Sequence, residues 1–158
     1  MSKKTINSRG TVESKVRELA ENQFPDCAYI FANFAQANVY FDKIEKPTIM
    51  YLLPPGGSFI IHHDRVREKP STQLWFLCPS DFDFDSAEND CRAEAMKRLG
   101  LRFIHAMNNS GMFMPIEKFR YEVAYDAFDM NLTGVCFPLE LEEKEGLLLC
   151  DERYEPQK

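Results

Sequence analysis

Residues 48–63 read TIMYLLPPGGSFIIHH, and this stretch constrains the fold more than any other. Its first six residues form an apolar run, which is typical of a β-strand that is buried on both faces. Pro55-Gly56 suits the two central positions of a type II turn. Residues 58–63 then predict a returning strand. We therefore expect residues 48–63 to form a β-hairpin whose tip is residues 54–57.

Further strand patterns lie on both sides of this hairpin. Strands are expected at residues 38–41, 72–78, 119–126 and 135–142, with a short one at 146–150. In the 72–78 run, Leu74, Phe76 and Cys78 share one face, opposite Trp75 and Leu77. Pro138 inside the 135–142 run indicates an edge strand or a bulge, because proline donates no ladder hydrogen bond. In residues 27–36 the pattern does not decide between helix and strand.

Two amphipathic helices complete the pattern. The first has Val12, Val16, Leu19 and Ala20 at helical spacing, opposite Glu13, Lys15, Arg17 and Glu18, and ends before Pro25. The second is expected at about residues 86–108, where Cys91, Ala95, Leu99, Phe103 and Met107 follow at four-residue steps. The element order predicts an α+β fold, with a mostly antiparallel sheet and both helices packed on it.

The chain length of 158 residues suits one domain with a single core. We expect a flexible N-terminal arm over residues 1–10, one α+β domain over residues 11–151, and a polar C-terminal tail over residues 152–158. The aromatic content is 13%, with 13 Phe, which suits either a core or an interface.

Charge and cysteine usage disfavour several classes of function. The formal net charge of −6 disfavours nucleic-acid binding, which depends on Lys and Arg at phosphates. The five cysteines form no C-x-x-C pair, so neither a disulfide framework nor a zinc ribbon is indicated. Cys78, Cys91 and Cys136 have apolar neighbours and are expected in the core. This cysteine usage predicts a reducing compartment. We also find no signal peptide or membrane span.

The reactive-looking side chains form no complete catalytic pattern. His62 and Asp64 could meet on one strand face, but a metal would need a third ligand, such as His105 or an Asp. Asp81, Asp83 and Asp85 resemble a calcium loop that lacks its glycine, and they suit an acidic helix entry better. The Glu-rich run 140–145 is interpreted as a solvated face. We therefore expect no enzyme activity and no cofactor.

Two alternatives remain open at this point. One is a metal-dependent hydrolase that uses His62, Asp64 and an aspartate of residues 81–85. The other is a cytosolic binding module or chaperone. Bound zinc or manganese that is lost on His62→Ala would favour the first.

Three stretches carry a resemblance to a known family: residues 70–77 (PSTQLWFL), residues 83–99, and residues 125–135 (YDAFDMNLTGV). Over residues 11–151 the chain resembles a family of uncharacterised proteins encoded in phages and prophages of Bacteroides-type bacteria. The element order is also similar to that of tail-terminator and head–tail completion proteins of tailed phages. The resemblance implies a structural protein of the virion that is assembled in the host cytoplasm. It further implies a homo-oligomeric ring, hexameric or of higher order, that contacts tail-tube or portal proteins while DNA passes through without specific binding.

Partner contacts are expected in the 128–134 segment, at the hairpin tip and in the N-terminal arm. The candidate residues are Asp129, Asn131, Thr133, Gly134, Pro55, Gly56, Lys3 and Lys4. A structural turn explains the 128–134 segment equally well, because Asp129 and Asn131 favour turns and Gly134 permits a positive φ.

Overall fold

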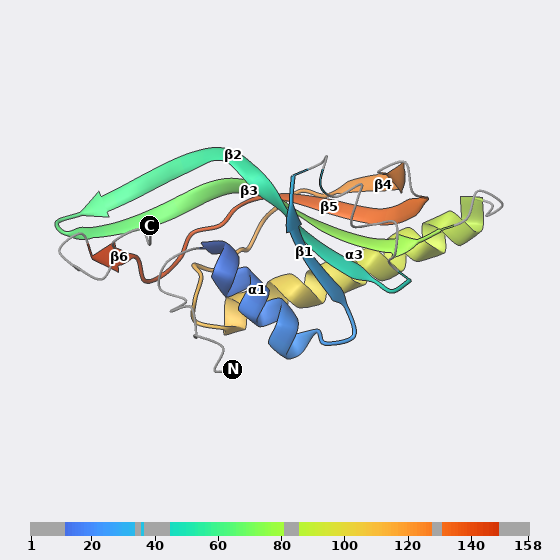
Figure 1. Ribbon diagram of the computed structural model, residues 1–158, viewed down its shortest axis with the longest axis horizontal. Helices are drawn as coiled ribbons and strands as arrows, with labels where there is room; N and C mark the ends of the chain where they lie inside the picture. Colours follow the sequence, from blue (N-terminus) through green and yellow to red (C-terminus); the bar gives the residue numbers. More distant parts are fainter. Residues whose placement is uncertain (1–11, 34–35, 37–44, 81–85, 128–130, 149–158) are drawn as a thin grey trace.

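A computed structural model describes residues 12–33, 36, 45–80, 86–127 and 131–148 (Figure 1). Its elements are α1 (Val12–Gln23), β1 (Ala28–Ala32), β2 (Thr48–His62), β3 (Arg65–Pro79), α3 (Ser86–Asn109), β4 (Glu122–Ala127), β5 (Leu132–Glu140) and β6 (Leu147–Leu148). The predicted N-terminal segment (1–10), the predicted C-terminal tail (152–158) and the predicted strand at 38–41 lie outside the described residues.

The described strands form one sheet in the order β1-β2-β3-β5-β4, with β6 pairing with β3. β1 and β2 are parallel, and the other pairs are antiparallel. Figure 1 shows α1 and α3 on the same side of this sheet. The α+β class, the mostly antiparallel sheet and the two packed helices are therefore confirmed.

The hairpin has its turn in a different place from the one predicted. β2 continues through residues 54–57, and the chain reverses at His63-Asp64, where His63 has a φ of 53°. The register shifts between Leu52 and Gly56, so that three residues of β2 stand against Thr72 alone. This bulge accommodates two prolines that cannot donate to the ladder. The predicted tip at residues 54–57 is therefore wrong.

The main core lies between the sheet and the helices. Its centre is a group of rings in which Phe103 lies 5.3 Å from Phe24 and 5.7 Å from Phe76, measured between ring centroids. The predicted faces of both helices contribute to it, since Val12, Val16, Leu19 and Ala20 of α1 and Leu99, Phe103 and Met107 of α3 are all buried.

Cys91 and Ala95 were predicted on the buried stripe of α3, but both are exposed. The reason is geometric. Steps of four residues drift by roughly 40° each against a period of 3.6, so a stripe that faces the sheet at Met107 has turned away at Cys91. Ala93 and Met96 are buried at that end of the helix instead. The expectation that Cys91 is a core residue is therefore wrong, whereas Cys78 and Cys136 are buried as predicted.

A smaller apolar cluster lies on the other face of the sheet, where Met50, Leu77 and Leu132 pack together. The alternation predicted for β3 is confirmed, because Leu74, Phe76 and Cys78 belong to the main core while Leu77 and Trp75 belong to this second cluster. Residues 48–52 are buried on both faces, as the apolar run predicted.

Pro138 and Gly134 show how β5 fits between its neighbours. β4 pairs with residues 132–136 of β5, so Pro138 lies where β5 has only β3 beside it among the described strands. Gly134 lies opposite Leu77, and the positive φ predicted for it is found at Asn131 instead (48°). Glycine is needed at 134 for space, because a Cβ there would lie 1.9 Å from the carbonyl oxygen of Phe76.

We expect Gly134→Ala to lower the free energy of unfolding by about 1–3 kcal/mol, because the obstacle is main chain and β3 and β5 would have to separate. Gly56→Ala is the matched control, since a Cβ at Gly56 meets nothing within 4 Å, and its effect should stay within about 0.5 kcal/mol. Urea denaturation of both variants measures the difference. Equal effects would contradict this account of Gly134.

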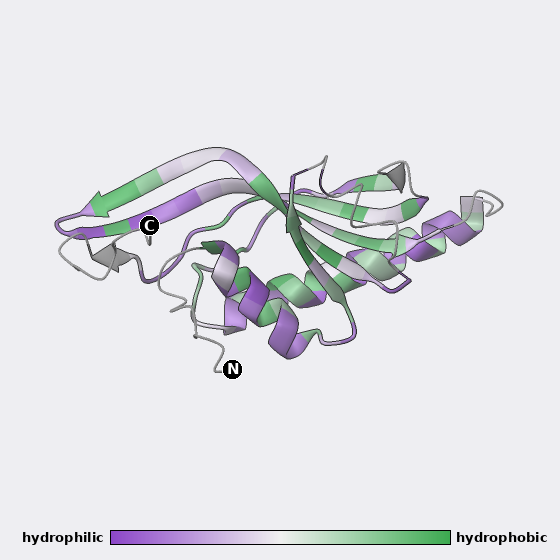
Figure 2. Ribbon diagram, viewed as in Figure 1, coloured by the Kyte–Doolittle hydropathy of each residue, from purple (hydrophilic) through white to green (hydrophobic). Residues whose placement is uncertain are grey.

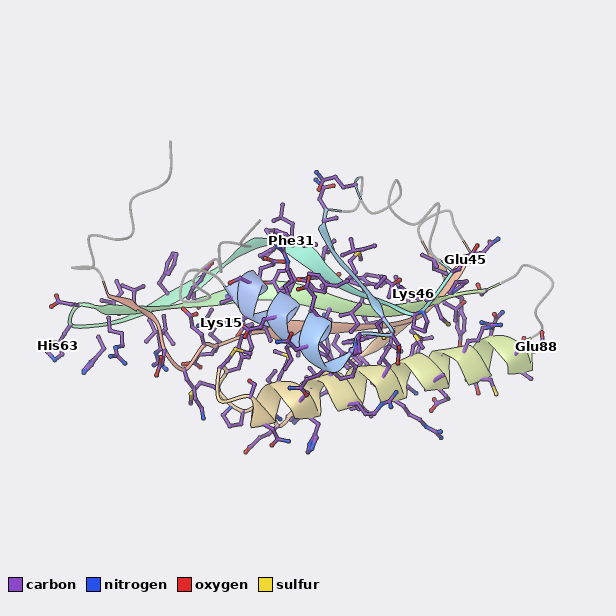
Figure 3. The ribbon with its side chains drawn as sticks, turned by 60° about the horizontal axis from the view of Figure 1, so that its bottom comes forward. Lys15, Phe31, Glu45, Lys46, His63 and Glu88 are labelled. Carbon is purple, nitrogen blue, oxygen red and sulfur yellow. The ribbon has the colours of Figure 1, made fainter. Side chains whose placement is uncertain are left out.

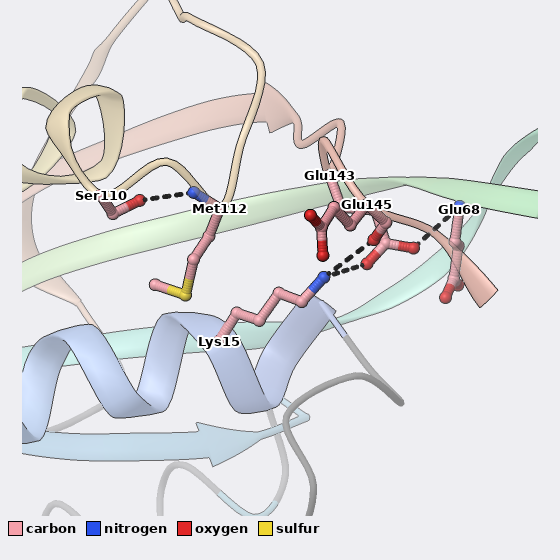
Figure 4. A network of polar contacts seen from close by, with 6 residues as sticks. All are labelled: Lys15, Glu68, Ser110, Met112, Glu143 and Glu145. Carbon is pink, nitrogen blue, oxygen red and sulfur yellow. Dashed lines mark hydrogen bonds and ion pairs between the residues drawn. The ribbon is translucent and has the colours of Figure 1, made fainter.

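One charged pair is buried, against our expectation that Lys15 and the 140–145 run face solvent (Figure 4). Lys15 and Glu143 are each 6% exposed, and Lys15 Nζ lies 2.7 Å from Glu143 Oε2. Lys15 Nζ also donates to the Glu145 carbonyl, and Glu143 Oε1 accepts from the Glu68 backbone N–H. The pair therefore joins α1, β3 and the segment after β5.

Two tyrosines, the buried Tyr51 and the partly buried Tyr29, give the fold a dependence on alkaline pH. Burial raises the pKa of Tyr51 to about 12. Burial also raises the pKa of Tyr29, and the neighbouring carboxylate of Glu13, which accepts a hydrogen bond from the Tyr29 hydroxyl at 2.9 Å, adds to this shift. Both phenols therefore keep their protons in the folded chain above pH about 10, where the unfolded chain loses them.

This shift in pKa stabilises the fold fully below pH about 10, and the stabilisation is lost as the pH rises toward 12, because the unfolded chain then binds fewer protons. We expect Tyr29→Phe to make this loss less steep. Urea denaturation followed by circular dichroism at pH values from 8 to 11.5 measures it (roughly the window that the phenol pKa values set). The same pH dependence in both proteins would contradict the assignment.

Candidate interaction surface

The part of the β2–β3 hairpin beyond the bulge, residues 56–71, projects from the body of the molecule, and we call it the arm (Figure 1). Figure 3 shows its tip at His63, at the opposite end of the molecule from Glu88 at the start of α3. The arm exposes two large apolar side chains, with Phe59 at 69% and Ile61 at 66%. Figure 2 shows this apolar end of β2.

The outer edge of β2 is unpaired along the arm. β1 pairs only with residues 48–52, so residues 53–62 have no second strand beside them in the part of the chain that the structure describes. These ten residues include no Asp, Glu, Lys or Arg. Natural edge strands are usually protected by charges, because their free N–H and C=O groups recruit other strands. An exposed, uncharged, apolar edge is typical of a surface that a partner covers.

The pairing register places the apolar row of the arm on the helix side of the sheet. Phe59 lies opposite Glu68 and Ile61 opposite Val66. Even-numbered residues of β3 point to the helix side, since Leu74 and Phe76 lie in the main core. Residues paired across antiparallel strands point to the same side, so Phe59 and Ile61 do as well.

A second exposed row lies at the opposite edge of the sheet. Tyr121, Val123 and Tyr125 are 54%, 39% and 51% exposed, and they precede or belong to β4. Val123 pairs with Val135 of the main core, so it also faces the helix side, whereas Tyr125 lies in an irregularity of β4 between Ala124 and Ala127. No strand pairs with the outer edge of β4 among those that the structure describes.

A charged side chain of α3, Lys97, contacts Tyr121 at one end of this second row. The Lys97 ammonium lies 4.6 Å from the centre of the Tyr121 ring and donates a hydrogen bond to Glu94. This hydrogen bond raises the pKa of Lys97 and lowers the pKa of the Glu94 carboxyl. Both groups are therefore charged at neutral pH, and Tyr121 is positioned by a cation–π contact.

The predicted contact residues lie in different surroundings. Pro55 lines an open groove of about 560 Å³ at the bulge, together with Leu53, Gln73 and Pro138, and Gly56 is exposed beside it. The Asn131 carbonyl accepts hydrogen bonds from the backbone and side chain of Ser80. Thr133 and Gly134 are buried in β5 and offer no surface to a partner in this structure. Lys3, Lys4 and Asp129 lie outside the described residues.

The histidine cluster lies at the tip of the arm. His62 ends β2, His63 and Asp64 form the turn, and the two imidazole rings are 4.5 Å apart. Within residues 12–33, 36, 45–80, 86–127 and 131–148, no group of three or more His, Cys, Asp or Glu is placed to hold a metal. Residues 81–85 lie outside these ranges. None of the described helices is long and apolar enough to cross a membrane.

The most exposed apolar residues were not identified from the sequence. The sequence patterns place Phe59, Ile61 and the row at residues 121–125 on strands. They do not indicate which of these side chains is exposed. Two signals could have found them, namely the uncharged run at 53–62 and the alternation of Tyr121, Val123 and Tyr125. Searches of protein-family models, of curated proteins and of solved structures found no match to this chain.

Proposed function

We propose that this chain is a non-enzymatic structural protein of a tailed-phage virion. In this proposal it forms a ring at the head–tail junction, as a tail terminator or a tail-completion (neck) protein. The observation that carries the proposal is the arm, whose uncharged free edge and bare Phe59 and Ile61 need a partner. The resemblance of residues 70–77, 83–99 and 125–135 to a phage and prophage family supports the choice of partner.

The arrangement of the exposed rows suits a ring subunit. A ring closes through heterologous contacts, in which two different surfaces of each copy meet. The arm and the β4 edge are two such surfaces, at opposite edges of one sheet. Tyrosine and phenylalanine are enriched at protein–protein interfaces, because they bury a large area for few rotatable bonds. The net charge of −6 would also keep DNA from adhering during passage.

Mass spectrometry of gradient-purified particles tests the proposal. The particles would come from the phage or prophage that encodes this chain. We expect the chain in the particles at a constant ratio to the portal protein, in a number that fits one ring. Host cytosolic proteins of the same lysate serve as the control for carry-over. Absence of the chain from particles that contain portal and tail-tube proteins would refute the proposal.

A further inference from the structure

We infer that the free edge of the arm binds β4 of a second copy of this chain, so that the sheet of one copy continues into the sheet of the next. This inference rests on the proposed function, because it names the contact that would build the ring. The occupant of the edge must be a strand, since residues 56–62 present a row of backbone donors and acceptors that no strand among the described residues pairs with.

The strand directions fit this contact. β2 is antiparallel to β3, β3 to β5, and β5 to β4, so β4 runs antiparallel to β2. A second copy placed beside the arm in nearly the same orientation therefore presents its β4 antiparallel to β2. The alternation of directions continues across the boundary between the copies. β1 occupies the edge only at residues 48–52, which leaves ten residues for the six of β4.

The sides of the sheet fit as well. Phe59 and Ile61 face the helix side, and so do Val123 and Tyr121, whereas Tyr125 lies in the irregularity of β4 between Ala124 and Ala127. In a continued sheet both rows lie on the same face and meet across the boundary. Aromatic and β-branched side chains on neighbouring strands stabilise such pairs. The contact would cover the most exposed apolar side chains of the arm with the exposed row of β4.

The opposite face carries charged side chains on both edges. On β4 this face presents Glu122, which pairs with Cys136 rather than with a residue of the main core. On the arm the odd-numbered residues of β3 face this side, and they include Arg65, Arg67 and Lys69. Arg67 and Lys69 already form ion pairs within the chain, with Glu142 at 3.1 Å and with Glu140 at 3.5 Å. The contact between the copies therefore rests on the backbone edge and the apolar rows, and this face adds little charge attraction.

Two variants separate this contact from the other possibilities. The arm variant (Phe59→Lys, Ile61→Lys) destroys the arm edge and keeps β4. The β4 variant (Val123→Lys, Tyr125→Lys) destroys the β4 edge and keeps the arm. All four side chains are exposed, so both variants should fold, which circular dichroism and thermal unfolding verify. Leu101→Lys, at a half-exposed apolar residue of α3 that belongs to neither strand, is the matched control.

Analytical ultracentrifugation and native mass spectrometry across a range of concentrations give the readout. We expect closed rings for the unmodified chain and for Leu101→Lys, and single chains for each double variant. A mixture of the two double variants should give a dimer with one copy of each, which doubles the mass. In that dimer the unmodified arm of the β4 variant contacts the unmodified β4 of the arm variant.

Three results would overturn the inference: an unmodified chain that stays monomeric, a double variant that assembles alone, or a mixture that remains monomeric. A β4 variant that dimerises alone would indicate that two arms pair. Failure here is distinguishable from failure of the proposed function. Rings of the unmodified chain together with its absence from virions would refute the function alone, whereas its presence in virions without strand pairing would refute the contact alone.

Discussion

Replacing Lys15 by methionine is expected to lower the free energy of unfolding by about 3–5 kcal/mol, because it leaves the Glu143 carboxylate buried without its cation. Both residues are only 6% exposed, so water cannot replace the lost ammonium. The pair also links α1 to the segment after β5, so the loss affects the docking of the helix. Urea denaturation of the variant and of the unmodified chain measures the effect.

A double variant separates the cost of an unpaired charge from the loss of packing. Lys15→Met combined with Glu143→Gln removes both charges, and the glutamine oxygen can still accept the backbone N–H of Glu68. We expect this double variant to recover most of the stability, because replacing a whole buried ion pair by neutral groups is often close to neutral. A single variant as stable as the unmodified chain would show that the pair is solvated.

Truncating Phe103 to alanine is expected to cost about 3–5 kcal/mol, the usual range for a fully buried phenylalanine. Its ring is 0% exposed and contacts Phe24 after α1 and Phe76 of β3. The cavity left behind would lie where both helices meet the sheet, so neighbouring side chains could fill little of it. Thermal and urea unfolding measure the loss.

The same substitution on the arm is the matched control. Phe59→Ala removes the same ring from a residue that is 69% exposed, so its effect on the free energy of unfolding of the unassembled chain should stay within about 0.5 kcal/mol. Similar losses at residues 59 and 103 would contradict the assignment of Phe103 to the core and of Phe59 to the surface.

Much of the fold could be predicted because local patterns agree with the final packing. The spacing of Val12, Val16 and Leu19 defines the buried face of α1, and the alternation in residues 72–78 defines the two faces of β3. The position of the hairpin turn could not be predicted. Pro55-Gly56 suits a turn locally, but the ladder between residues 56–62 and 65–71 continues the strand past it, with a bulge in its place.

The surface was harder to predict than the core. Phe59 and Ile61 are exposed because the helices do not extend along the sheet as far as these residues. No local sequence pattern indicates how far the helices extend. The burial of Lys15 likewise depends on Glu143, which lies 128 residues further along the chain. Thr133 and Gly134 were candidates because they belong to the 128–134 segment, and their place inside β5 removes them from the surface.

Electron microscopy of the assembled phage particle tests the central claim most directly. The account predicts a closed ring of this chain at the head–tail junction, with the arm of each copy against β4 of its neighbour and a continuous sheet around the ring. A neck map in which every ring is explained by other proteins would contradict the account, as would arms that extend freely into solvent.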